Sequence, residues 1–184
     1  MIFGDIIKQR RVNLKADRIG PDMPFTHWKL YFKKSMLALC QSKFLKFANN
    51  AEFRPGAYAI GCSKIEIGER VVIRPQCMLF GDSITSEKTI TIENHVMLGS
   101  GVHIYVSNHR FDTVEIPLID QGHYLPKPVV LKEGCWIGAN TVILPGVIIG
   151  ENTVVGAGSV VTKSIPSGVV AVGNPAKVIK EIGL

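Results

Sequence analysis

The 184-residue sequence contains no long hydrophobic run, because its apolar stretches are only a handful of residues long. A membrane-spanning helix needs about 20 such residues, so none is expected. The first five residues also lack a basic stretch followed by an apolar core, which predicts no secretory signal peptide and a cytoplasmic location. The four cysteines form no CxxC pair. They predict neither a disulfide framework nor a zinc ribbon, and we interpret them as small buried hydrophobic residues.

Positive charge is unevenly distributed along the chain. Residues 1–54 contain 11 Lys/Arg and 4 Asp/Glu, whereas residues 55–184 contain 10 Lys/Arg and 11 Asp/Glu. The sequence has no helix-turn-helix pattern, RNP motif or zinc finger, so we expect no nucleic-acid partner. The basic N-terminal segment is expected either to form a solvated face or to meet an anionic membrane surface or an acidic glycan.

The chain changes character near Pro55, which we take as the boundary between a basic segment, 1–54, and a repeat domain, 55–184. Within the first segment, apolar residues recur at separations of three and four with lysines between them, which predicts a helix near residues 26–47. We expect this helix either to pack on the rest of the chain or to make peripheral contact with the inner face of a membrane.

A period of six residues dominates the second segment. An aliphatic residue stands at the first position of six consecutive hexads: Leu131, Ile137, Ile143, Ile149, Val155 and Val161. The same phase recurs upstream, around residues 67–79 and 92–104. Neither a helix of 3.6 residues per turn nor an alternating strand has this period. A coil of short parallel strands does, with aliphatic residues pointing inward and Gly or Asn at the corners, so we predict a hexapeptide β-helix.

The repeat is interrupted twice. Residues 81–88 add one residue to the phase and predict a small insertion. Residues 107–128 lack the pattern altogether and predict a long protruding loop that opens with Asn108-His109. Long loops on rigid solenoids commonly carry function.

These repeats, Asn108-His109, and the segments 135–140, 156–163 and 172–179 resemble the hexapeptide-repeat acyltransferases. Within that family the chain is similar to the galactoside, maltose and polysaccharide O-acetyltransferases. The resemblance covers residues 55–184 and implies a left-handed parallel β-helix, a homotrimer with sites between neighbouring subunits, and acetyl-CoA as co-substrate. No resident metal is expected. The implied activity is O-acetylation of a carbohydrate acceptor, a sugar hydroxyl of a surface polysaccharide or of its precursor.

The resemblance also implies roles for individual residues. His109 is expected to be the general base, since an imidazole can take the proton of a sugar hydroxyl as it attacks a thioester. A backbone N–H near Gly138 is a candidate donor to the oxyanion. The cofactor-binding residues are expected to be Trp136, Gly138, Ala139, Ala157, Thr162, Lys163, Lys177 and Lys180. The lysines suit the phosphates of coenzyme A.

Three further residues are candidates for acceptor binding: Asp82, Asn108 and Asp112. Asp82 can accept hydrogen bonds from sugar hydroxyls or simply form a turn. Asp112 can orient His109 or cap its own loop. The other histidines are expected to be structural.

Three alternative functions remain open at this stage. The acceptor can be an amine of an amino-sugar nucleotide or an antibiotic, or an amino acid such as serine. The same fold also supports zinc-dependent hydratases of the carbonic anhydrase type, which need three converging histidines. The third alternative is a non-catalytic scaffold.

Overall fold

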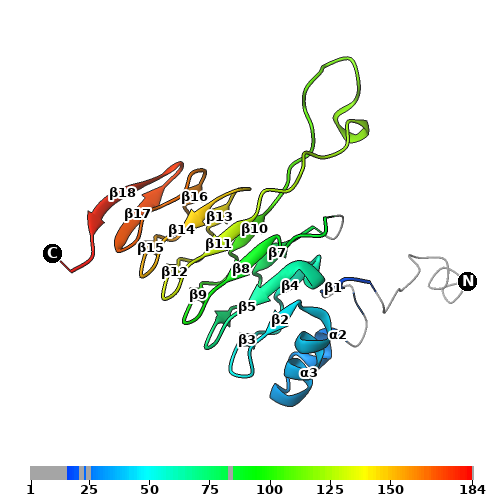
Figure 1. Cartoon of the computed structure of the whole chain (residues 1–184), viewed down its shortest axis with the longest axis vertical. Helices are drawn as coiled ribbons and strands as arrows, with labels where there is room; N and C mark the ends of the chain where they lie inside the picture. Colours follow the sequence, from blue (N-terminus) through cyan, green and yellow to red (C-terminus); the bar gives the residue numbers. More distant parts are fainter. Residues whose placement is uncertain (1–15, 21–22, 24–25, 83–84, 184) are drawn as a thin grey trace, which may run out of the picture.

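A computed structural model describes residues 16–20, 23, 26–82 and 85–183. It shows a solenoid of short strands that form three sheets, with two helices at one end and a hairpin at the other (Figure 1). Sheet A contains, in spatial order, β1 (Arg18–Ile19), β4 (Tyr58–Ile60), β7 (Met78–Phe80), β10 (His103–Tyr105), β13 (Val142–Ile143) and β16 (Val160–Val161).

The other two sheets follow the same progression. Sheet B contains β2 (Lys46–Phe47), β5 (Ile65–Ile67), β8 (Ile90–Ile92), β11 (Val129–Leu131) and β14 (Ile148–Ile149). Sheet C contains β3 (Glu52–Phe53), β6 (Val72–Ile73), β9 (Met97–Leu98), β12 (Trp136–Ile137), β15 (Val154–Val155), β17 (Val169–Gly173) and β18 (Ala176–Glu181). Neighbouring strands are parallel except at the edges, where β1 pairs with β4 and β17 pairs with β18 in antiparallel fashion.

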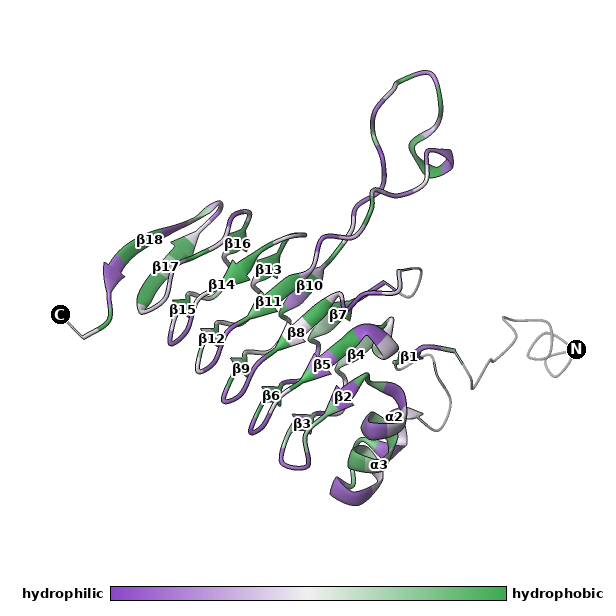
Figure 2. Ribbon diagram, in the orientation of Figure 1, coloured by the Kyte–Doolittle hydropathy of each residue, from purple (hydrophilic) through white to green (hydrophobic). Residues whose placement is uncertain are grey.

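The core confirms the prediction from the six-residue period. All six aliphatic residues that define the hexads are fully buried. Residues at equivalent positions of successive coils pair in register, as Ile104 does with Leu79 on one side and Ile143 on the other. Hydrophobic residues follow the strands and polar residues gather at the corners (Figure 2).

The predicted single helix over residues 26–47 is wrong in its extent. The segment forms two helices, α2 (Thr26–Lys29) and α3 (Lys33–Lys43), and its last residues belong to strand β2. Helix α3 buries Met36, Leu39 and Cys40 against the first coil of the solenoid. It therefore closes the open end of the β-helix.

The solenoid also begins earlier than Pro55. Phe47 pairs with Ile67, and Phe53 pairs with Ile73, so β2 and β3 form part of the first coil. Phenylalanine replaces the aliphatic residue at these positions, which hides the repeat in the sequence. Phe44, just after α3, packs on both rings at centroid distances of 5.5 Å.

The two predicted interruptions are present in the structure. The smaller interruption lies between β7 and β8, where residues 83 and 84 are outside the described part of the chain. Residues 106–128 leave the solenoid between β10 and β11 as a long protruding loop that contains the short 3₁₀ helix η2 (Leu118–Asp120) (Figure 1). A second 3₁₀ helix, η1 (Cys62–Lys64), lies between β4 and β5. In the described part of the chain, no helix is long and apolar enough to cross a bilayer.

The four cysteines give a test of the core. All are free and buried, and burial raises the pKa of the Cys62 and Cys135 thiols to about 12. Burial also raises the pKa of Cys40 and Cys77. Because the thiolate is the reactive form, the folded protein should not react with Ellman's reagent at neutral pH, whereas guanidinium-unfolded protein should release four equivalents of chromophore. Rapid reaction of any thiol in the folded protein would contradict this packing.

Candidate functional site

The protruding loop starts from a short two-stranded ribbon that holds His109. The N–H of Arg110 donates to the carbonyl of Gly122, and that of Tyr124 donates to the carbonyl of Asn108, both at 2.9 Å. His109 and His123 stand opposite each other in this ribbon, with ring centroids 4.0 Å apart. Backbone pairing therefore fixes the position of His109 although its side chain is exposed.

A cavity of about 460 Å³ lies at the foot of the loop, beside the carboxyl ends of the strands of sheet A. It brings together three predicted site residues, Asp82, Asn108 and His109. Phe80 and Tyr105 form its aromatic wall, with rings stacked 4.8 Å apart and nearly parallel. An imidazole, hydrogen-bonding side chains and a flat apolar surface therefore line one cavity.

Phe80, Tyr105 and His123 did not stand out in the sequence. Phe80 and Tyr105 are paired residues of adjacent parallel strands, so their contact depends on strand register. His123 lies 14 residues after His109, and only the antiparallel ribbon brings the two together. The available signal for His123 was that it and His109 lie near opposite ends of the segment without repeats, residues 107–128.

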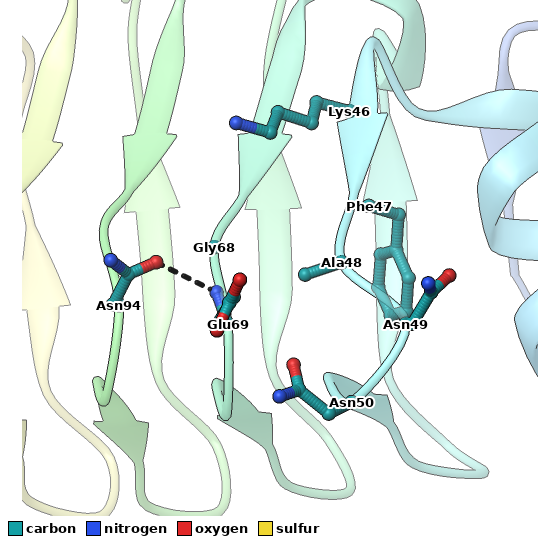
Figure 3. Close-up of a pocket in the computed structure, with 8 residues that line it drawn as sticks. All are labelled: Lys46, Phe47, Ala48, Asn49, Asn50, Gly68, Glu69 and Asn94. Carbon is teal, nitrogen blue, oxygen red and sulfur yellow. Dashed lines mark hydrogen bonds between the residues drawn. The ribbon is translucent and has the colours of Figure 1, made fainter.

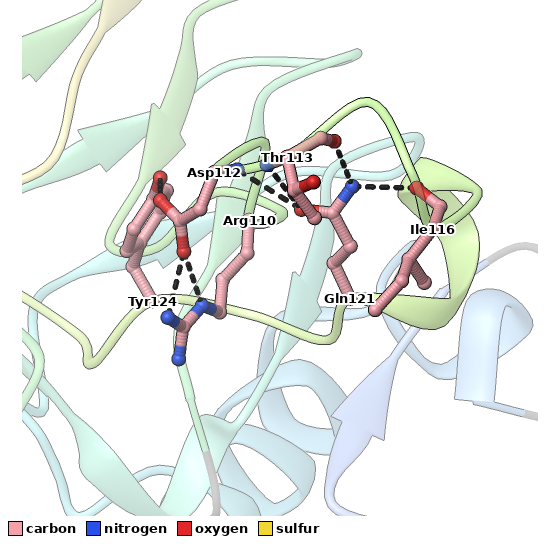
Figure 4. Close-up of polar contacts among 6 residues, drawn as sticks. All are labelled: Arg110, Asp112, Thr113, Ile116, Gln121 and Tyr124. Carbon is pink, nitrogen blue, oxygen red and sulfur yellow. Dashed lines mark hydrogen bonds and ion pairs between the residues drawn. The ribbon is translucent and has the colours of Figure 1, made fainter.

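Asp112 makes a different set of contacts from the one expected for an orienting residue. One of its oxygens accepts from Arg110, which forms an ion pair at 2.6 Å, and the other accepts from the Tyr124 hydroxyl (Figure 4). The hydrogen bond from Tyr124 and the charge of Arg110 lower the pKa of Asp112. Its carboxylate therefore holds the loop together, as the second reading of Asp112 predicted.

Gln121 reinforces the same structure. Its side-chain oxygen accepts from the N–H of Asp112 at 2.9 Å, and its amide nitrogen donates to the carbonyls of Thr113 and Ile116 at 2.8 Å (Figure 4). The loop carrying His109 is therefore cross-linked by polar contacts beyond its ribbon.

A second group of predicted residues forms a column along the corner between sheets C and A. A Cβ on Gly138 would lie 2.4 Å from the backbone nitrogen of Ala157, and one on Gly99 would lie 2.5 Å from that of Ala139. The coils approach too closely there for any side chain. Within the part of the chain that the structure describes, the N–H groups of Ala139 and Ala157 have no hydrogen-bond partner.

Gly138 itself does not supply the free backbone N–H that is expected near it as a donor to the oxyanion. Its N–H donates to the carbonyl of Val155 at 2.7 Å, as part of the bonding between coils. The Gly138 N–H is therefore already used by the fold, whereas the N–H of the next residue, Ala139, has no partner among the residues that the structure describes.

The remaining predicted cofactor residues lie in three places. Trp136, half exposed on β12, shares a cavity of about 440 Å³ with Ala139. Lys177 and Lys180 are exposed on β18 at the end of sheet C. Thr162 lies at the opposite corner of sheet A, where it lines a cavity of about 700 Å³ with Asn108 and Tyr124, and Lys163 follows it.

The cavity that contains His109 and the column that contains Ala139 and Ala157 lie at opposite ends of the strands of sheet A. His109 follows β10, whereas Ala139 precedes β13 and Ala157 precedes β16. Within one chain, the structure does not bring His109 into the cavity that contains Trp136.

A further cavity, of about 620 Å³, lies at the corner between sheets B and C (Figure 3). It is lined by corner residues such as Asn50, Glu69 and Asn94, and the side-chain oxygen of Asn94 accepts from the N–H of Glu69 at 2.9 Å. These amide side chains satisfy the turns of neighbouring coils, so we assign this cavity to the architecture of the solenoid.

Comparison with known proteins supports the repeat assignment. Residues 128–163 match the family described as bacterial transferase hexapeptide (six repeats). The galactoside O-acetyltransferase of Escherichia coli K12 is 37% identical over 145 residues, which cover 79% of this chain and 68% of that protein. The putative colanic acid biosynthesis acetyltransferase WcaF of the same strain is 31% identical, over 77% of this chain and 82% of that protein. A putative acetyltransferase of Dictyostelium discoideum is 48% identical, but the match spans only 47% of its length.

A solved structure gives the same result in three dimensions. A galactoside acetyltransferase in complex with coenzyme A superposes with a TM-score of 0.72 at 32% sequence identity, over 85% of this chain and 78% of that one. With this shared architecture and the extent of the sequence matches, the chain belongs to the hexapeptide-repeat acetyltransferase family, whose fold is the left-handed parallel β-helix.

Proposed function

We propose that this protein transfers an acetyl group from acetyl-CoA to a hydroxyl group of a carbohydrate, with His109 as general base. The observation that carries the proposal is the cavity that joins His109 to Asp82, Asn108 and an aromatic wall. A flat aromatic surface suits the apolar face of a sugar ring, while the carboxylate and amide suit its hydroxyls.

The reaction follows from these groups. The imidazole of His109 accepts the proton of the acceptor hydroxyl as the oxygen attacks the thioester carbon. The C–S bond then breaks, and the proton passes from the imidazolium to the departing thiolate. The products are an acetyl ester and free coenzyme A, and no acyl-enzyme is needed.

The column at the corner between sheets C and A is the proposed binding surface for acetyl-CoA. Relatives with this fold have been solved with coenzyme A and with acetyl-CoA. The free N–H groups of Ala139 and Ala157 can donate to amide carbonyls of the pantetheine arm. The Ala139 N–H, which lies next to Gly138 in the chain, is the proposed donor to the oxyanion.

A homotrimer would complete the site. Because His109 and Trp136 lie in different cavities of one chain, the base must meet the thioester across a subunit boundary. We therefore propose that the loop of one subunit faces the corner column of the next.

The proposed acceptor is a sugar unit of a surface polysaccharide or of its precursor. The similarity to the galactoside and colanic acid acetyltransferases supports a carbohydrate. An amine acceptor uses the same base and cofactor, and the related AntD is an N-acyltransferase. An acceptor screen that follows thiol release separates the two.

For the zinc hydratase, the described residues contain no group of three His, Cys, Asp or Glu side chains placed to hold a metal ion.

The N-terminal helices and the turn between them expose aromatic and basic side chains that suit an anionic membrane surface, and we refer to these residues, 28–33, as the membrane-facing surface. Trp28, Tyr31 and Phe32 are 71%, 58% and 69% exposed. The exposed lysines Lys29 and Lys33 lie among them in the sequence. Aromatic rings favour the headgroup region of a bilayer, and lysines favour anionic lipids. This face would bring the enzyme to lipid-linked precursors.

Replacement of His109 tests the proposed base. In the presence of an accepted sugar, His109→Ala should lower kcat about 10²–10⁴-fold, because the hydroxyl loses its proton acceptor. Binding of acetyl-CoA, measured by calorimetry, should be retained. His95→Asn is the matched control, since His95 bonds to Glu133 at a distant corner and asparagine tolerates its positive φ of 62°. Full activity of His109→Ala would contradict the assignment.

The membrane-facing surface is tested by vesicle sedimentation of the full-length protein. The double variant Trp28→Ser/Phe32→Ser should bind vesicles of phosphatidylglycerol and phosphatidylcholine more weakly, since each lysine alone contributes only about 1 kcal/mol near such a surface. Ile182→Ser, at the far end of the chain, is the control because Ile182 is 45% exposed. Unchanged vesicle binding with an altered oligomeric state would instead assign this face to a subunit contact.

A further inference from the structure

We propose that the acceptor is anionic and that Arg54 and Arg74 bind its carboxylate or phosphate group. This inference rests on the proposed acetyl transfer and specifies its acceptor. Both arginines line the cavity of about 440 Å³ that also contains Met97, Trp136 and Ala139. Nothing in the catalytic scheme derived above uses them.

Along the solenoid, the two arginines lie on the side of Trp136 that is opposite to the proposed path of coenzyme A. In sheet C the strands follow the order β18, β17, β15, β12, β9, β6, β3. Trp136 lies on β12, and the lysines expected to meet the phosphates of coenzyme A lie on β18. These strands are three steps apart, or about 14 Å at the usual strand spacing, which leaves room for a pantetheine arm along the sheet.

Arg74 and Arg54 lie on the other side of Trp136. Arg54 directly follows β3, and Arg74 directly follows β6. In the order of the sheet, β9, β6 and β3 lie on the side of β12 that is opposite to β18. If the cofactor runs from Trp136 toward β18, its thioester end faces the arginines. A group bound by the arginines would therefore belong to the acceptor and not to coenzyme A.

The charges in the cavity are not balanced. Arg54 pairs with Glu52, with N–O distances of 2.9 Å. The guanidinium of Arg74 is exposed, and within the described part of the chain it makes no hydrogen bond or ion pair. Among the described residues, no carboxylate side chain lines the cavity. Because Glu52 neutralises only Arg54, the two arginines leave a net charge of +1 beside the proposed thioester site.

A guanidinium binds carboxylate and phosphate groups through two parallel hydrogen bonds. A neutral sugar would leave the charge of Arg74 unpaired. Two sources supply the required chemistry: the carboxylate of a uronic acid and the phosphate of a sugar phosphate or nucleotide sugar.

The test compares matched acceptors with the full-length protein. p-Nitrophenyl glucuronide is compared with p-nitrophenyl glucoside, and glucose 1-phosphate with glucose, in an assay of thiol release from acetyl-CoA. At least one anionic compound should have the higher kcat/KM. In Arg74→Gln the ratio of anionic to neutral kcat/KM should fall about tenfold, mainly through KM, which corresponds to about 1.4 kcal/mol. The glucuronide and phosphate arms identify which anion is preferred.

A binding measurement separates this inference from the proposed reaction. In the His109→Ala protein with coenzyme A present, calorimetry should still show tighter binding of the preferred anionic compound than of its neutral partner. Anion-selective binding by a wild-type protein that transfers no acetyl group would refute the reaction and leave the anion site standing. Acetyl transfer without anion preference would refute the anion site alone.

Two controls exclude indirect effects. Arg70→Gln removes an exposed arginine from the corner between sheets B and C, and it should leave the anionic-to-neutral ratio unchanged. The mass of each variant in solution is measured in parallel. Equal binding of anionic and neutral compounds by the wild type would overturn the proposal. Loss of the oligomer in Arg74→Gln would also overturn it, because it would assign Arg74 to a carboxylate of a neighbouring subunit.

Discussion

The stacking of one aliphatic residue on the next along the solenoid is the constraint on which the structure depends. Each coil supplies side chains that are fully buried only because the coils above and below cover them. Burial of one such side chain contributes about 1.5–3 kcal/mol, so a single coil gains little until its neighbours are present. Parallel pairing in strict register follows, since a shift of one residue would turn these side chains outward.

The same constraint shapes the corners where the chemistry is proposed to occur. Thr141 and Ser159, which are fully buried, donate to the carbonyls of Gly138 and Gly156, at 2.8 Å and 2.7 Å. These internal bonds hold the turns in place. With the turns fixed, glycine allows the coils to approach, and within the described residues the N–H groups of Ala139 and Ala157 have no hydrogen-bond partner. The candidate cofactor surface is thus built largely from backbone.

The sequence predicts what depends on local repetition and misses what depends on register or on contacts between distant segments. The six-residue period around Ile137 predicts which aliphatic side chains are buried. Phe47 and Phe53 occupy the equivalent buried positions in the first coil. An aromatic residue does not match an aliphatic pattern, so the sequence did not reveal them. The helix near residues 26–47 is interrupted because its end must become strand β2, a tertiary demand that periodicity does not show.

The candidate site likewise combines residues that local sequence motifs identify with residues that only strand register brings together. Asp82, Asn108 and His109 can be selected from motifs and loop boundaries, and the structure places them around one cavity. Phe80 and Tyr105 could not be selected, because their stacking requires knowledge of which strands are neighbours. The use of the Gly138 N–H by Val155 likewise becomes visible only when the coils are stacked.

A rigid solenoid also explains why one chain does not hold the complete proposed site. Its strands run straight from one corner to the next, so groups at opposite ends of sheet A cannot converge by bending the chain. His109 lies at the foot of the loop after β10, beside the carboxyl ends of the strands of sheet A, while Trp136, Ala139 and the two arginines line a cavity at the other end of these strands. A second subunit is the simplest way to place a base opposite a thioester under these conditions. In the proposed assembly the cofactor surface and the base can vary separately, and the acceptor would be selected by the side chains that border both, with Asp82 on one side and Arg74 on the other.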